Sequence, residues 1–301
     1  MAPATTRLPK IGITVGDVAG VGPEIALRCM GLDDVRQICT PLLFGPVDAI
    51  KHLADRYRLP CPPLIGSAGK NEWLTNEELP ETGGLVDIGT VSISDLRPGH
   101  FSGQTGQASF DAVQAAIDAA IAGQVDGIVT CPIQKEAWHL AGIAFPGHTE
   151  LLASRTGTDN VKMMLTSDEI SCVLVTIHIP LANVPAALTR EAVLDAIRLA
   201  AASLGRRLGR SARVVVCGLN PHAGENGIFS HGEEETLIAP AIRQASDEGI
   251  DVVGPLSPDT AFTPSMRAST DVYVCMYHDQ GLIPLKALSF DDAVNVTLGL
   301  P

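Results

Sequence analysis

A polar cluster follows an apolar run near the C-terminal end of the sequence. Residues 272–276 have the composition of a buried strand. They are followed at once by His278 and Asp279, then by Gly281, which would permit a tight bend, and by Lys286. Because ligands of open α/β sheets bind beyond the carboxyl ends of the strands, we expect a functional site in this segment. A solvated loop is the alternative interpretation of the same residues.

Two more histidines follow apolar runs in the same way. His178 comes just after residues 171–176, and His222 comes shortly after residues 213–217. Imidazole nitrogen suits zinc and related divalent ions, and three protein ligands with one open position are typical of a catalytic metal site. We therefore predict that His178, His222 and His278 bind one divalent metal, with zinc, magnesium and cobalt all open. The alternative is three separate hydrogen-bonded histidines, because sequence spacing does not show that they meet.

The composition limits the classes of protein to which the chain can belong. Its 301 residues are 46% hydrophobic, enough for a substantial core, and its net charge is −13. This charge argues against nucleic acid and anionic membranes as partners, and an anionic substrate would need a local cation. The seven cysteines are scattered without a Cys-x-x-Cys pair, and neither a long apolar span nor a signal peptide is evident. We expect a cytoplasmic protein with reduced cysteines.

Segments with strand and helix character alternate along the chain. Further strands are predicted at residues 11–15, 41–44, 85–88 and 125–130. Residues 189–208 have the apolar spacing of one long amphipathic helix. Ser109 and Thr149 are each placed to cap the start of a helix. The alternation indicates an α/β protein with a mostly parallel sheet.

Five motifs give the chain a resemblance to a known family. They are Gly-Asp-Val-Ala-Gly-Val-Gly-Pro-Glu at 16–24, Pro-Gly-His-Thr-Glu at 146–150, Leu-Asn-Pro-His-Ala-Gly-Glu at 219–225, the segment 276–286, and Val-Asn-Val-Thr-Leu-Gly-Leu-Pro at 294–301. In these motifs the chain resembles the 4-hydroxythreonine-4-phosphate dehydrogenases, the NAD-dependent enzymes of vitamin B6 biosynthesis. The resemblance covers nearly the whole chain, and it specifies the family more tightly than the substrate.

The resemblance implies a two-lobed fold like that of isopropylmalate dehydrogenase, with the active cleft between the lobes. Residues 1–130 together with 250–301 would form the first α/β lobe, and residues 131–249 the second, dimer-forming lobe. The resemblance also implies a homodimer whose subunits share each active site, so the three histidines need not come from one chain. Relatives continue past the position of Pro301 with an arginine that contacts the substrate phosphate, and we expect the sequence to continue there as well.

The resemblance also implies a reaction and its cofactors. The enzyme would use NAD and a divalent metal to oxidise and decarboxylate 4-phosphooxy-L-threonine, giving 3-amino-2-oxopropyl phosphate. The metal would lower the pKa of the substrate hydroxyl. Lys286 and Asn295 would hold the phosphate end, with His148 and Thr149 at the remaining substrate contacts. Either Lys286 or Asp279 would move the proton.

Two other functions stay open. One is a catabolic paralogue that oxidises another four-carbon hydroxy-acid phosphate, such as threonate or erythronate phosphate, or a cis-diol. The other belongs to a different class and is a metal-binding protein without dehydrogenase activity. Formation of NADH from 4-phosphooxythreonine in the presence of a divalent metal separates the three possibilities.

Overall fold

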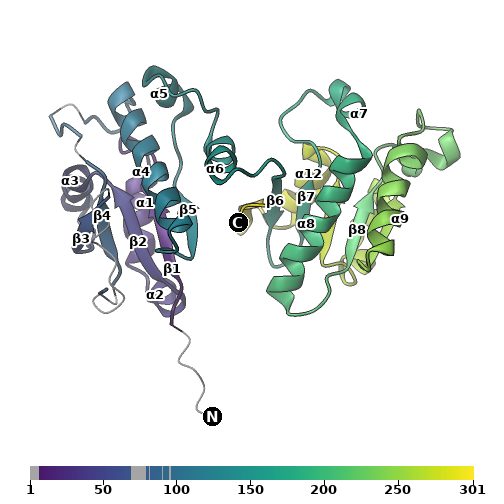
Figure 1. The fold of residues 1–301 in the computed structure, drawn as a ribbon, viewed down its shortest axis with the longest axis horizontal. Coiled ribbons are helices and arrows are strands. Elements are labelled where there is room, and N and C mark those ends of the chain that lie inside the picture. Colours follow the sequence, from purple (N-terminus) through teal and green to yellow (C-terminus); the bar gives the residue numbers. More distant parts are fainter. Residues whose placement is uncertain (1–6, 69–78, 81, 90, 95) are drawn as a thin grey trace, which may run out of the picture. The chain divides into compact units, whose positions relative to one another are not determined.

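The chain forms two compact units, Met1–Gly157 and Thr158–Pro301, each with its own β-sheet. The computed structural model describes residues 7–68, 79–80, 82–89, 91–94 and 96–301 (Figure 1). Within that part of the chain, no helix combines the length and the apolar character needed to cross a membrane. All seven cysteines are free, and Cys172, Cys217 and Cys275, which lie within apolar runs of the sequence, are buried.

The first unit is built on a sheet of five parallel strands. The strands are β1 (Lys10–Thr14), β2 (Thr40–Gly45), β3 (Leu64–Ser67), β4 (Gly84–Asp87) and β5 (Gly127–Thr130), in the spatial order β3-β4-β2-β1-β5. The side chains of Leu42, Leu43 and Phe44 in β2 are fully buried. This agrees with the rule that parallel strands with both faces covered are continuous apolar runs.

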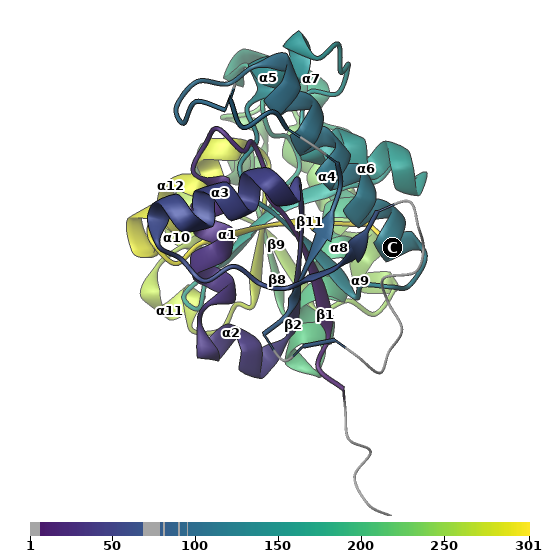
Figure 2. The same cartoon turned by 90° about the vertical axis from the view of Figure 1, so that its left-hand side faces the viewer.

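Helices cover both faces of the first sheet. The helices of this unit are α1 (Gly22–Met30), α2 (Asp33–Ile38), α3 (Val47–Tyr57), α4 (Gly103–Ile121), α5 (Lys135–Leu140) and α6 (His148–Thr156), and the last two pack on α4. Figure 2 shows α1 and α3 on one face of the sheet and α4 on the other. Pro23 lies in the first turn of α1, where its missing N–H costs no hydrogen bond.

The second unit is built on a sheet of six strands. They are β6 (Lys162–Thr166), β7 (Ser171–Leu174), β8 (Val214–Cys217), β9 (Val252–Leu256), β10 (Val272–Cys275) and β11 (Val294–Leu298), in the spatial order β11-β6-β7-β10-β8-β9. Strands β7, β10, β8 and β9 are parallel, whereas β6 pairs antiparallel with both β7 and β11. The predicted α/β class with mostly parallel sheets is therefore confirmed.

One long helix covers the centre of the second sheet. The helical segments of this unit are η1 (Leu181–Asn183), α7 (Val184–Ala187), α8 (Arg190–Leu208), η2 (Pro221–Gly227), η3 (Glu234–Ile238), α9 (Ala239–Asp247), α10 (Pro258–Ala261), α11 (Pro264–Arg267) and α12 (His278–Leu288). Helix α8 is the predicted amphipathic helix. Thr189 caps it by accepting a hydrogen bond from Ala192 N at 3.0 Å, and Val193 and Ile197 are fully buried on its inner face.

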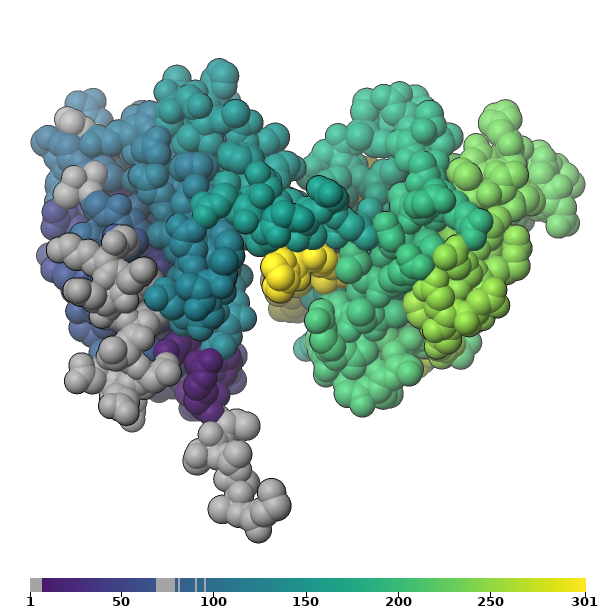
Figure 3. Space-filling model, viewed as in Figure 1, coloured from purple at the N-terminus to yellow at the C-terminus, as the bar shows by residue number. Residues whose placement is uncertain are grey.

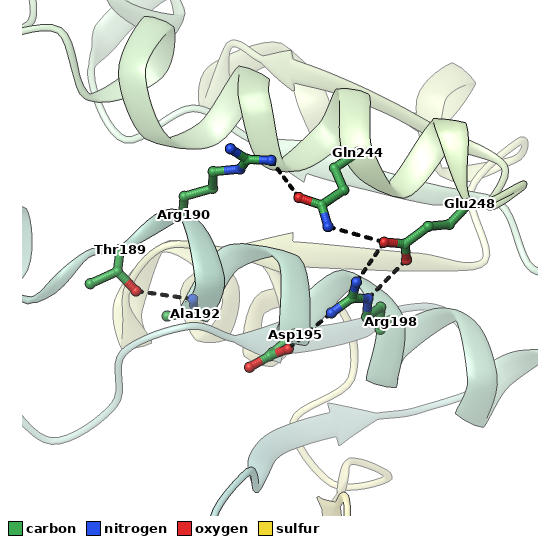
Figure 4. A network of polar contacts seen from close by, with 7 residues as sticks. All are labelled: Thr189, Arg190, Ala192, Asp195, Arg198, Gln244 and Glu248. Atoms are coloured by element: carbon green, nitrogen blue, oxygen red, sulfur yellow. Dashed lines mark hydrogen bonds and ion pairs between the residues drawn. The ribbon is translucent and has the colours of Figure 1, made fainter.

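A surface network of polar contacts joins α8 to α9 (Figure 4). Arg198 of α8 makes ion pairs with Asp195 of its own helix and with Glu248, and Gln244 of α9 links Glu248 to Arg190. Exposed pairs of this kind contribute little to stability, so the apolar face of α8 accounts for most of the packing.

The structure divides the chain differently from the expected lobes. Residues 250–301 were expected to join the first lobe, but they supply β9, β10 and β11 to the second sheet. Strand β10 is hydrogen-bonded on both sides, by β7 and β8, and is therefore central to the second unit. The boundary between the units falls at Gly157 rather than near residues 130 and 250.

Neither predicted cap is observed. Helix α4 begins six residues before Ser109, because Ser102 and Thr105 exchange the two hydrogen bonds of a capping box at 3.0 and 3.2 Å. Ser109 is buried inside the helix, where its hydroxyl accepts a hydrogen bond from Trp138 Nε1 at 2.7 Å. Helix α6 begins at His148, one residue before Thr149, and has no side-chain cap.

The substitution Ser109→Ala should lower the free energy of unfolding more than Ser102→Ala. The first leaves the buried Trp138 N–H without its acceptor, at a cost of about 1–3 kcal/mol. The second removes a helix cap, at a cost of about 1 kcal/mol. Urea unfolding followed by circular dichroism measures both, with exposed Ser211→Ala as the control. An unchanged midpoint for Ser109→Ala would show that the bond to Trp138 contributes nothing.

Candidate active site

The three histidines predicted to bind metal follow three neighbouring strands. Strands β7, β10 and β8 lie side by side and parallel, so their carboxyl ends share one edge of the second sheet. His178 follows β7, His222 lies in η2 after β8, and His278 is the first residue of α12 after β10. The fold therefore places all three at the edge where open α/β sheets bind ligands.

The structure brings two of the three imidazoles together. The ring centroids of His178 and His278 are 5.5 Å apart. With metal–nitrogen distances near 2 Å, two imidazoles on one ion have centroids roughly 5–6 Å apart, so this pair fits a shared divalent ion. Across the described part of the single chain, no group of three or more His, Cys, Asp or Glu side chains could hold a metal. One chain therefore does not bring His222 into a group with the other two.

His278 also has a carboxylate partner. Its Nδ1 atom lies 2.7 Å from Asp279 Oδ1. A carboxylate at Nδ1 favours the tautomer with a proton on that nitrogen, which leaves Nε2 free to act as a ligand. Asp279 is thus placed to orient His278.

One face of α12 lines a hollow beside this pair. The hollow has a volume of about 350 Å³ and is lined by His278, Asp279, Leu282, Ile283, Lys286 and Ala287. His278, Leu282 and Lys286 are four residues apart and therefore share a helix face. Lys286 is exposed, with Nζ 6.0 Å from the centroid of the Phe290 ring. The site thus combines an imidazole pair with an ammonium group in a protein of negative net charge.

Gly281 does not form the predicted bend. It lies inside α12 and is buried. A Cβ atom at this position would lie 3.0 Å from Cys275 Sγ and 3.1 Å from Cys172 Cβ. Glycine is therefore needed because α12 packs closely on the sheet, and the polar segment after β10 is the start of a helix rather than a loop.

Two buried polar side chains join the strand ends that carry the histidines. Gln280 accepts a hydrogen bond from Met276 N at 2.7 Å and donates one to Gly218 O at 2.7 Å, so it links β10 to β8. Thr176 Oγ1 donates to Met276 O at 2.7 Å and links β7 to β10. Neither residue was assigned this role from the sequence. A glutamine directly after the His278-Asp279 pair, one turn from a buried strand end, was the available signal.

His222 lies in an unusual backbone segment. Residues 222–226 all have positive φ, with values of 54°, 50°, 80°, 41° and 56°. Gly224 and Asn226 tolerate this left-handed conformation, whereas His222, Ala223 and Glu225 each cost about 1–2 kcal/mol. The segment lies at the surface of the second unit (Figure 3), and the His222 ring centroid is 5.8 Å from that of Phe229. Contacts elsewhere must therefore stabilise the turn.

The predicted substrate contacts fall in both units. His148 and Thr149 begin α6 of the first unit, whereas Lys286 and Asn295 belong to the second. Asn295 is exposed on β11, opposite Leu165 of β6.

The environment of His148 favours its neutral form. Its Nε2 atom is buried and has no hydrogen-bond partner within the described residues, and its ring packs edge-on against Trp138. Burial, together with the nearby Lys135, lowers the pKa of His148 to about 4. A buried, unpartnered nitrogen on a neutral ring is suited to a hydrogen bond with a ligand.

Comparison with known proteins identifies the family. A family model described as pyridoxal phosphate biosynthetic protein PdxA matches residues 37–301. A 4-hydroxythreonine-4-phosphate dehydrogenase from Desulfosudis oleivorans is 44% identical, with 97% of this chain and 86% of that protein aligned. A D-threonate 4-phosphate dehydrogenase from Cupriavidus necator is 40% identical, with 98% and 87% aligned.

A solved structure agrees with these relatives. The crystal structure of a 4-hydroxythreonine-4-phosphate dehydrogenase from Klebsiella pneumoniae matches with a TM-score of 0.84 and 35% identity, over 97% of this chain and 88% of that one. The resemblance that the five motifs indicated is therefore confirmed. The chain belongs to the PdxA family and is a dehydrogenase.

Proposed function

We propose that this dehydrogenase oxidises and decarboxylates 4-phosphooxy-L-threonine to 3-amino-2-oxopropyl phosphate, with NAD as the hydride acceptor. The name of the 44% identical relative supports the substrate. The structural observation that carries the proposal is the imidazole pair of His178 and His278, with Lys286 lining the same hollow as His278 on one face of α12. A metal ion held by the imidazoles would act on the hydroxyl to be oxidised, and the ammonium group would hold the phosphate.

His178, His222 and His278 would hold the divalent ion, which is zinc, magnesium or cobalt. Their neutral imidazoles suit such ions, and the spacing of the His178–His278 pair fits a shared one. When bound, the ion lowers the pKa of the substrate hydroxyl. Asp279 keeps His278 in the tautomer that a metal ligand needs.

We also propose a homodimer whose subunits share each site. One chain groups only two of the three imidazoles, so a second copy would supply the third. Leu181, Ile228 and Ile283 are each about two-thirds exposed or more, and they lie in or next to the segments that carry the histidines. A second subunit would cover these apolar side chains. The seven free cysteines support a cytoplasmic location.

The remaining residues bind the substrate and move its proton. The Lys286 ammonium and the Asn295 amide hold the phosphate, because a protein with a net charge of −13 needs a local cation for an anionic ligand. His148 and Thr149 supply neutral hydrogen-bonding groups. The hydroxyl proton passes to Asp279 or Lys286, the titratable neighbours of His278 on α12.

Oxidation of D-threonate 4-phosphate is the second candidate function. The 40% identical relative from Cupriavidus necator carries that name. This substrate also joins a phosphate to a four-carbon hydroxy acid, so the same histidines and Lys286 would serve it. The two substrates differ in the group at the second carbon, an amine in one and a hydroxyl in the other.

A substrate comparison tests the proposed function. The chain supplied with NAD and a divalent metal should form NADH from 4-phosphooxy-L-threonine, and a chelator should abolish the activity. His178→Ala should lose at least about 100-fold in kcat/KM through loss of the metal, with exposed His52→Ala as the control. A higher kcat/KM for D-threonate 4-phosphate would favour the second candidate, and no NADH from either substrate would contradict both.

Replacement of Lys286 tests the phosphate contact. Lys286→Ala should raise KM for the phosphorylated substrate about 10-fold or more, because an ion pair to phosphate is lost. Lys286→Arg should restore part of the affinity, and Lys51→Ala on exposed α3 is the control. If kcat is retained, Asp279 moves the proton; if kcat also falls steeply, Lys286 does. An unchanged KM would remove Lys286 from the site.

The protonation of His148 can be measured directly. Its imidazole should titrate by NMR near pH 4 rather than near pH 6.5. Between these values the unfolded chain binds the proton and the folded chain does not, so the free energy of unfolding should fall as the pH falls through this window. The variant His148→Gln should lose less stability between pH 6.5 and 4. A midpoint near 6.5 would show that the ring is accessible to water.

A further inference from the structure

The left-handed turn at residues 222–226, which carries His222, depends on the buried carboxylate of Glu234. Glu234 is 2% exposed and is the first residue of η3, a short π-helix. Its Oε1 atom accepts a hydrogen bond from Asn220 N at 2.8 Å, and the Asn220 side-chain amide lies 3.2–3.3 Å from both of its oxygens. One carboxylate thus holds the backbone and the side chain of the residue two positions before His222.

The same carboxylate sets the space inside the turn. A Cβ atom on Gly224 would lie 2.8 Å from Glu234 Oε2, and one on Gly218 would lie 3.4 Å from Oε1. The backbone on both sides of His222 therefore approaches Glu234 closely. A change in the length or polarity of the Glu234 side chain would therefore alter the backbone conformation of residues 218–224.

A second carboxylate extends the contact to the far side of the turn. Glu233 is 9% exposed and accepts hydrogen bonds from Asn220 Nδ2 at 3.2 Å and from His231 N at 2.8 Å. Within the described residues neither glutamate forms an ion pair. The oxygens of the two carboxylates accept hydrogen bonds from Asn220 and His231, the residues that flank the turn on either side. The turn and the two carboxylates are therefore mutually dependent.

We propose that Glu234 is a positioning residue that fixes the left-handed turn and so presents His222. Three of the five residues in the turn, His222, Ala223 and Glu225, adopt an unfavourable conformation, and the bonds to Asn220 offset that cost. An apolar side chain of the same size would fill the space but would leave the Asn220 N–H unsatisfied. The inference rests on the proposed function only in taking His222 as a metal ligand.

Hydrogen exchange and metal binding test this role with matched variants. Glu234→Met keeps the length of the side chain and removes both acceptors, Glu234→Gln restores one acceptor, and Glu235→Met makes the same change at an exposed neighbour. We expect Glu234→Met to speed amide exchange across residues 220–226 about 10-fold or more, with α8 unchanged. The Kd for Co²⁺, measured with the metal alone, should rise about 10–100-fold. Glu234→Gln should be intermediate, and Glu235→Met should match the unmodified protein.

The outcomes separate the inference from the proposed function. Unchanged exchange at residues 220–226 in folded Glu234→Met would overturn the inference. Faster exchange throughout the second unit, including α8, would show a general packing role and would overturn it as well. If His222→Ala leaves Co²⁺ binding unchanged while Glu234→Met loosens the turn, Glu234 does hold the turn, and the assignment of His222 as a ligand fails.

Discussion

The side-chain amide of Gln280 is the contact on which the arrangement of the candidate site depends. It is buried at the start of α12, and its two hydrogen bonds join the end of β10 to the end of β8. Each polar end of the amide makes a hydrogen bond that offsets the cost of its burial, so the side chain acts as a rigid bridge. Strand β8 leads to His222 and β10 leads to His278. The bridge therefore fixes the relative positions of the two strand ends from which these histidines follow.

Close packing of α12 on the sheet is the second constraint. Gly281 lies against Cys172, Leu174 and Cys275, and larger residues at these positions would push the helix outwards. The adjacent Cys275 thiol and burial raise the pKa of Cys217 well above its ordinary value, so this thiol stays neutral. Cys217 therefore acts as a small apolar residue rather than as a ligand or a nucleophile. Cys172 and Cys275 are the small side chains that lie against Gly281. Their size allows α12 to place His278 beside His178.

The two halves of the site differ in how their histidines are held. His278 is fixed by a regular helix and by Asp279, both of which are local in sequence. His222 lies in a turn whose backbone is unfavourable by itself and whose stability comes from Glu234, fourteen residues from Asn220. The position of His278 is set wherever α12 forms, whereas the position of His222 depends on the packing of η3 against the end of β8.

The α/β class, the family, and the positions of most strands and of α8 could be predicted from the sequence, because apolar runs and long motifs are local signals. The sequence also indicated His178, His222 and His278, since each follows such a run. The place of residues 250–301 in the second sheet could not be predicted in this way, because strand order depends on pairing between segments distant in sequence. The roles of Gln280, Glu234 and Ser109 could not be predicted from the sequence either. The sequence does not distinguish a buried polar residue from an exposed one. The role of the buried residue is known only once the fold shows which group it is hydrogen-bonded to.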